Sequence, residues 1–163
     1  EDALVRTGNL LKLLVGDFTF RDEWGETYPT TFELFTTFAY LLFKEEGCQW
    51  AVIETGLGGR LDATNTILST ASVLCPIELE HTHILGSTIK EIAAEKAKII
   101  KPNQKVFIGL VQEEAKEVFL AECREKNSTP FLLGELLDGY TTHTTREGEK
   151  VSLKWKDGEE DEK

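Results

Sequence analysis

The segment KVFIGLV, at residues 105–111, is followed by EEAKEVFLAECREK at 113–126 and PFLL at 130–133. The first and last of these segments are short and apolar, which is typical of buried strands. The middle segment predicts an amphipathic helix. Its apolar face carries Ala115, Val118, Phe119 and Cys123. A strand, a helix and a strand in this order predict a parallel βαβ unit.

The same alternation extends towards the N-terminus. Residues 72–77 predict a second buried strand, with Pro76 near its end. Thr88 and Glu91 have the spacing of a capping box, so they predict a helix that runs to about residue 100 before Pro102. The expected fold class is therefore α/β, with a mostly parallel sheet flanked by helices.

The first third of the chain predicts helices. Residues 3–15 are rich in Leu and Val and predict one helix, and residues 17–29 predict a loop. Thr30 and Glu33 form a second capping-box pattern, and Gly47 ends the helix that follows it. That helix carries Leu34, Phe35, Phe38, Leu41 and Leu42 at helical spacing.

After residue 139 the pattern changes to the alternation of antiparallel strands. Residues 140–146 and 150–155, joined around Gly148, predict a hairpin at a sheet edge. Residues 156–163 are nearly all charged and are expected to fray. We therefore expect one domain over residues 1–155, followed by a charged tail at 156–163.

The composition excludes several classes of protein. A net charge of −11 without a dense Lys/Arg cluster argues against a nucleic-acid partner. The longest apolar run, residues 38–43, is far shorter than the roughly 20 residues of a membrane span. The 3 Cys are widely spaced without a zinc pattern, which favours reduced thiols and a cytoplasmic location. The start at Glu1 and the lack of Met suggest a piece of a longer protein.

The densest motif follows a third predicted strand, at residues 50–54. It reads ETGLGGRLDATN, from Glu54 to Asn65, and places a carboxylate and a flexible loop at a strand end. Ligands bind at such ends in open α/β sheets, which favours a functional loop over the alternative, a Gly-rich turn with a solvated Glu. The glycine spacing does not match GxGxxG, so a dinucleotide site is not supported.

Two further groups have possible chemical roles. His81 and His83, within the segment EHTH, would share a face if the preceding strand continued, but a polar loop is more common than a metal site. Lys96 lies among Ala and Ile on the predicted helix. Such a lysine usually extends its amine to water, so a functional role would need a specific reason.

Taken together, these segments resemble the folylpolyglutamate synthase/dihydrofolate synthase family of the Mur ligase superfamily. The resemblance rests on PTTFE at 29–33, ETGLGGRLDATN at 54–65 and LEHTHILGSTIKEIAAEKAKIIKPN at 79–103. It implies the central domain of an ATP-dependent amide ligase of folate biosynthesis and one-carbon metabolism. In this reaction ATP phosphorylates a carboxylate, and the amine of L-glutamate attacks the acyl phosphate. The acceptor is folate, its polyglutamate tail or dihydropteroate.

The resemblance also implies functional residues and a monomeric enzyme. Glu54, His81 and Lys96 correspond to the family's magnesium site, with Lys96 carried as a carbamate. Burial favours the neutral amine that reacts with carbon dioxide. Phe32 is expected to pack on a pterin ring. The residues corresponding to the family's dihydropteroate contacts are Thr30, Thr31, Phe32, Glu33, Leu61, Asp62 and Ala63.

The sequence departs from the family pattern at two positions and lacks one motif. Glu80 stands where the family usually has Asp, and Lys98 stands where it usually has Gly. None of the 13 Gly is followed by Lys, so the phosphate loop for ATP is expected before residue 1, and the glutamate-binding C-terminal domain after residue 163. Another Mur-type ligase, such as a peptidoglycan-precursor enzyme, and a noncatalytic binding domain on a degenerate ligase fold remain alternatives.

Overall fold

The structure is a computed structural model that describes residues 2–16, 20–22, 25–146, 148–158 and 160–162. The chain divides into two compact units. Unit 1 holds Glu1–Leu57 and Asp62–Thr66, and unit 2 holds Gly58–Leu61 and Ile67–Lys163. The Gly-rich motif therefore contributes residues to both units.

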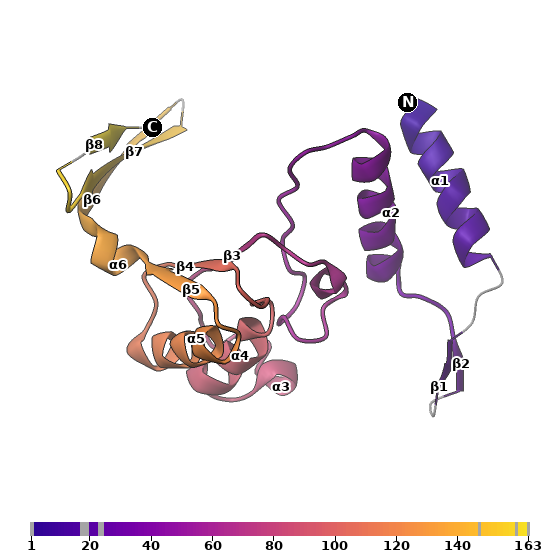
Figure 1. Ribbon diagram of the computed structural model, residues 1–163, viewed down its shortest axis with the longest axis horizontal. Helices are drawn as coiled ribbons and strands as arrows, with labels where there is room; N and C mark the ends of the chain where they lie inside the picture. Colours follow the sequence, from indigo (N-terminus) through magenta and orange to yellow (C-terminus); the bar gives the residue numbers. More distant parts are fainter. Residues whose placement is uncertain (1, 17–19, 23–24, 147, 159, 163) are drawn as a thin grey trace. The chain divides into compact units, whose positions relative to one another are not determined.

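Unit 1 is built on two helices that lie side by side, α1 (Asp2–Val15) and α2 (Thr31–Glu45) (Figure 1). Thr7 donates a hydrogen bond of 2.7 Å to the carboxylate of Glu45, which links the two helices. Both helices and the Thr30 capping box were predicted, and they are confirmed.

The predicted loop between α1 and α2 contains a short antiparallel pair, β1 (Phe20–Asp22) and β2 (Gly25–Thr27). Residues 17–19 and 23–24 of that prediction lie outside the described residues. A 3₁₀-helix, η1 (Ala63–Thr66), completes the unit. None of these three elements is predicted by the sequence pattern.

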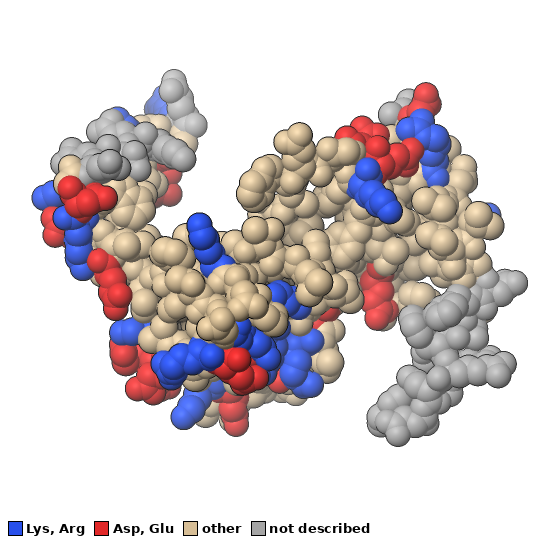
Figure 2. Space-filling model, in the orientation of Figure 1, with Lys and Arg blue, Asp and Glu red and all other residues tan. Residues whose placement is uncertain are grey.

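Unit 2 contains the predicted parallel sheet. Its strands, in spatial order, are β3 (Ala71–Leu74), β4 (Lys105–Ile108) and β5 (Thr129–Leu132). The helices α4 (Ile89–Ala97) and α5 (Glu113–Glu125) cover one face of it (Figure 1). The buried core between sheet and helices includes Leu74, Ile92, Val106, Ile108, Phe119 and Cys123. The parallel sheet flanked by helices is confirmed, and Figure 2 shows charges of both signs over the helical layer.

Two short helices of unit 2 were not predicted. They are α3 (Thr82–Leu85) and α6 (Leu133–Leu136). Strand β3 is shorter than expected, because Pro76 has no N–H to continue the ladder. Helix α4 ends three residues before the predicted residue 100.

The C-terminal hairpin is confirmed as β6 (Leu137–Thr145) and β7 (Gly148–Trp155). It does not extend the parallel sheet, however, but forms a separate antiparallel sheet with β8 (Glu160–Glu162). The expectation of a wholly frayed tail is therefore wrong, because part of the tail pairs with β7.

The predicted buried strand at residues 50–54 is also wrong. These residues form no strand, and the side chains of Trp50 and Val52 are 84% and 100% exposed. An apolar segment becomes a strand only where a neighbour satisfies its backbone groups. Among the residues that the structure describes, no strand pairs with this segment.

Candidate functional site

Asp62 organises the part of the Gly-rich loop that belongs to unit 1. Its Oδ2 accepts a hydrogen bond of 2.8 Å from the Leu57 N–H, and its Oδ1 accepts from the N–H and hydroxyl of Thr64 at 2.9 and 2.5 Å. Burial alone would raise the pKa of Asp62, but these bonds and one from Gly56 outweigh burial and lower it. Asp62 is thus an ionised tether that closes the loop on itself.

Phe32 packs against this loop at Gly56. A Cβ atom at Gly56 would lie 2.5 Å from Cζ of Phe32, so a side chain there would push the ring out of its present position. The Phe32 side chain is still 45% exposed. The ring therefore keeps apolar surface available beside a backbone that approaches it closely.

The first turn of α2 presents the other residues predicted to contact substrate. The N–H and hydroxyl of Thr30 donate to Oε2 of Glu33 at 2.7 and 2.8 Å, which completes the capping box. Thr31 is exposed on the same turn. Unit 1 thus brings together six of the seven predicted contact residues; Leu61 belongs to unit 2, where it is 81% exposed.

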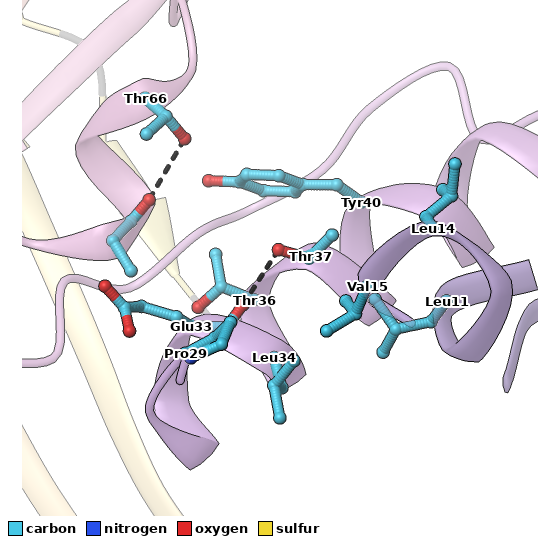
Figure 3. A pocket seen from close by; sticks show the side chains of 11 residues that line it. Leu11, Leu14, Val15, Pro29, Glu33, Leu34, Thr36, Thr37, Tyr40 and Thr66 are labelled. Carbon is cyan, nitrogen blue, oxygen red and sulfur yellow. Dashed lines mark hydrogen bonds between the residues drawn. The ribbon is translucent and has the colours of Figure 1, made fainter. Parts of the chain in front are cut away.

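A pocket of about 390 Å³ lies within unit 1 between its helices (Figure 3). Glu33 and Tyr40 lie along it, and the hydroxyl of Tyr40 donates 2.9 Å to the Thr64 carbonyl. Burial raises the pKa of Tyr40, so the phenol stays neutral. Other lining residues are Leu11, Leu14, Val15, Leu34, Ala63 and Thr66. The walls are mostly apolar with a few polar groups, which is typical of small-molecule sites.

The part of the loop in unit 2 docks on the C-terminal end of α4. A Cβ at Gly59 would lie 2.6 Å from the Glu95 carbonyl oxygen and 2.9 Å from that of Lys96. The Arg60 N–H donates 3.1 Å to the Glu95 carbonyl, and its side chain binds the Glu95 carboxylate. The loop therefore caps the Glu95 carbonyl, one of the groups that a helix end leaves without an intrahelical partner.

Lys96 lies on this capped turn and is half-buried. Its carbonyl accepts a hydrogen bond of 3.3 Å from Ile99, in a tight turn that ends the helix. The motif at residues 54–65 and the predicted functional lysine, 31 positions beyond its end, are thus in contact within unit 2.

His81 lies just before α3 in the left-handed backbone region, with φ at 50°, and its side chain is exposed. The condition for His81 and His83 to share a strand face is not met, because β3 ends at Leu74 and α3 begins at Thr82. A left-handed histidine is uncommon, and this conformation sets the direction of the chain into α3.

The charged residues near these motifs fall into two groups. Glu33, Asp62, Glu91 and Glu95 all accept hydrogen bonds, in helix caps, in the loop or in an ion pair. In the part of the chain that the structure describes, no hydrogen bond or ion pair engages the side chains of Glu54, His81 or Lys96. No three His, Cys, Asp or Glu side chains of the described residues form a metal-binding group. Glu54 belongs to unit 1 and the other two to unit 2, so their convergence stays a prediction.

Two ion pairs beside Lys96 were not predicted from the sequence. One joins Arg60 to Glu95, and the other joins Lys98, a departure from the family pattern, to Glu122 at 2.6 Å. The partners lie 35 and 24 positions apart, and no local pattern in one sequence signals such a pairing.

Within the described residues, no helix has the length and apolar character needed to cross a membrane.

The chain matches no family model. It is 42% identical over 110 residues to the dihydrofolate synthase/folylpolyglutamate synthase of Bacillus subtilis, covering 67% of this chain and 25% of the relative. It is 43% identical over 100 residues to the dihydrofolate synthetase of Saccharomyces cerevisiae, with 53% and 23% covered. The chain therefore spans about a quarter of these relatives.

Solved structures of related proteins match the fold over most of the chain. The folylpolyglutamate synthase of Mycobacterium tuberculosis complexed with ADP matches with a TM-score of 0.79 at 29% identity, covering 93% of this chain and 35% of that one. An FPGS–AMPPCP–folate complex matches with a TM-score of 0.75 at 31% identity, with 96% and 36% covered. Sequence and fold agree: the chain belongs to the folylpolyglutamate synthase/dihydrofolate synthase family.

Proposed function

We propose that this chain is part of an ATP-dependent ligase that adds L-glutamate to folate, polyglutamyl-folate or dihydropteroate. The observation that carries the proposal is the contact of Gly59 and Arg60 with the turn that bears Lys96. It joins two motif segments into one structural feature, next to a lysine whose side chain is not engaged elsewhere in the described residues.

In this reaction the acceptor carboxylate displaces ADP from the γ-phosphorus of ATP and becomes an acyl phosphate. The glutamate amine then attacks the acyl carbon, phosphate leaves and an amide bond forms. The relatives support this chemistry, since solved members of the family are complexes with ADP, AMPPCP and folate. The residues of this chain would bind the acceptor and orient the phosphate-bearing groups.

Glu54, His81 and a carbamate on Lys96 would hold magnesium. The donor set fits, because carboxylate and carbamate oxygens suit this hard cation and the imidazole supplies one nitrogen. Bound magnesium would neutralise phosphate charge during transfer. To form the carbamate, the neutral Nζ of Lys96 bonds to the carbon of CO₂ and releases a proton to solvent. A cation thereby becomes an anionic oxygen ligand.

The acceptor would bind to unit 1. Phe32 offers an exposed aromatic face for a pterin ring, and the apolar pocket beside Glu33 is lined by the same turn of α2. Asp62 and Ala63 lie at the start of η1 within this unit. The side chain of Glu33 accepts from Thr30, so it would act mainly by holding this turn in shape.

We also place the ligase in the cytoplasm and expect a monomer. The cysteines support the location, since Cys48, Cys75 and Cys123 are all free thiols. A second candidate function, a noncatalytic binding domain, is favoured by one observation: no Gly-Lys pair, the core of a phosphate loop, occurs in the 163 residues.

The experiment is a ligase assay on the longest polypeptide that contains this chain, with dihydropteroate or folate, ATP, magnesium and labelled glutamate. If the protein is a ligase, it should release phosphate only when glutamate is present. Glu54→Gln should then lose most of the rate of glutamate addition, with little change in the KM for the acceptor. A matched control is Glu46→Gln, an exposed acid at the end of α2. Acceptor binding without phosphate release, unchanged by Glu54→Gln, would favour the noncatalytic domain.

A further inference from the structure

Glu122 is a buried acid on the apolar face of α5. Its side chain is only 7% exposed, and its neighbours on the same face, Phe119 and Cys123, belong to the core. Its Oε1 has no hydrogen-bond partner in the described residues. A carboxylate in such a place needs a nearby cation, because burial without one is costly.

That cation comes chiefly from the end of α4. The Nζ of Lys98 donates to Oε2 of Glu122 at 2.6 Å, whereas the Nζ of Lys126 lies 3.6 Å from Oε1. Lys98 is the C-cap residue of α4, two positions beyond Lys96. The buried charge of one helix therefore holds the last turn of the other.

The last turn of α4 is also held at its N-terminal side, by a residue of the Gly-rich loop. Arg60 binds both the carbonyl and the carboxylate of Glu95, the residue before Lys96. Lys96 thus lies between two anchored residues, Glu95 and Lys98. An anchor on each side restricts the rotation of this short turn and so the direction in which the Lys96 side chain leaves it.

We propose that Lys98 and Glu122 are a positioning pair that orients Lys96 for carbamate formation, an inference that rests on the proposed function. Neither residue touches the reacting atoms. The pair acts through the backbone of residues 96–98, and Lys126 contributes to the environment of Glu122 without acting on that turn.

The test compares Lys98→Met with Lys126→Met in the intact chain. Both variants remove one cation next to Glu122, but only the first releases the end of α4. ¹³C NMR in ¹³C-bicarbonate measures the carbamate signal, which is assigned by its loss in Lys96→Arg. Hydrogen exchange by mass spectrometry follows the amides of residues 96–100, with those of residues 89–93 as an internal reference.

We expect Lys98→Met to lose most of the carbamate signal and to speed exchange at residues 96–100 about tenfold, since a partly buried, charge-assisted hydrogen bond is lost. Lys98→Arg keeps the cation and should retain the signal, and Lys126→Met should change neither measurement by more than about twofold. An unchanged Lys98→Met, or equal effects of Lys98→Met and Lys126→Met, would overturn the pair's positioning role.

The results distinguish a failure of the Lys96 carbamate from a failure of the positioning pair. A wild-type chain without any carbamate signal contradicts the modification of Lys96, and with it the orienting role for carbamate formation. Exchange that is faster in Lys98→Met alone would then assign the pair to the stability of the turn only. A wild-type signal that survives Lys98→Met leaves the proposed function intact and removes only the positioning pair.

Discussion

The backbone N–H of Arg60 donates a hydrogen bond of 3.1 Å to the carbonyl of Glu95, and Nε of Arg60 binds the Glu95 carboxylate at 3.0 and 3.2 Å. One residue of the Gly-rich motif thus satisfies both the backbone and the side chain of a residue in α4. The glycine before it is needed for this approach. A motif that is usually associated with ligands here also has a structural role.

Gly59→Ala should destabilise unit 2 by about 1–3 kcal/mol, because its Cβ would meet backbone oxygens that cannot move aside without shifting α4. Urea unfolding followed by circular dichroism measures the change. The control is Gly139→Ala, since a Cβ there meets nothing within 4 Å. Its effect should stay within about 0.5 kcal/mol. Equal stability of Gly59→Ala and wild type would refute the close approach.

The contribution of Asp62 to stability should depend on pH. Its pKa is lowered in the folded chain, so the stabilisation is fully present above the unfolded value of about 4 and is lost as the pH falls through the lower folded pKa. The stability difference between wild type and Asp62→Asn should therefore be largest near neutral pH and shrink in acid. Amide exchange at Leu57 and Thr64 reports this locally. A stability difference that does not change with pH would contradict the role of the ionised Asp62 carboxylate in holding this loop.

The 163-residue chain itself should bind Mg-ATP weakly or not at all. The physical reason is the lack of a Gly-Lys-Ser/Thr loop, whose backbone N–H groups and lysine hold the phosphates in P-loop enzymes. Isothermal titration calorimetry measures this directly. Micromolar affinity would mean that other residues of the chain form a nucleotide site.

Elements that depend on interactions between residues close in sequence could be predicted, and those that depend on distant residues could not. The capping boxes at Thr30 and Thr88, the βαβ unit around α5 and the β6–β7 hairpin depend on local patterns, and the sequence was sufficient to predict them. Residues 50–54 have the apolar pattern of a strand, but pairing decides the outcome, and the described residues offer no partner.

The same limit to prediction from the sequence holds for the candidate site. The motif residues and Lys96 could be identified from the sequence through resemblance, whereas the pairs of Arg60 with Glu95 and Lys98 with Glu122 could not. Both pairs join residues that are distant in the sequence, and charge patterning does not specify which acid meets which base. Lys98, unexplained as a departure from the family, finds its physical reason in the buried Glu122.

Chemical rescue of Lys96 is the sharpest test of whether a carbamate on this residue takes part in the reaction. In the polypeptide that contains this chain, Lys96→Ala should lower kcat for glutamate addition far more than it changes the KM for the acceptor. Added acetate or formate should restore part of the rate, because a free carboxylate can replace the carbamate, whereas Lys96→Arg should not respond. A Lys96→Ala variant with the wild-type rate would contradict a catalytic role for Lys96.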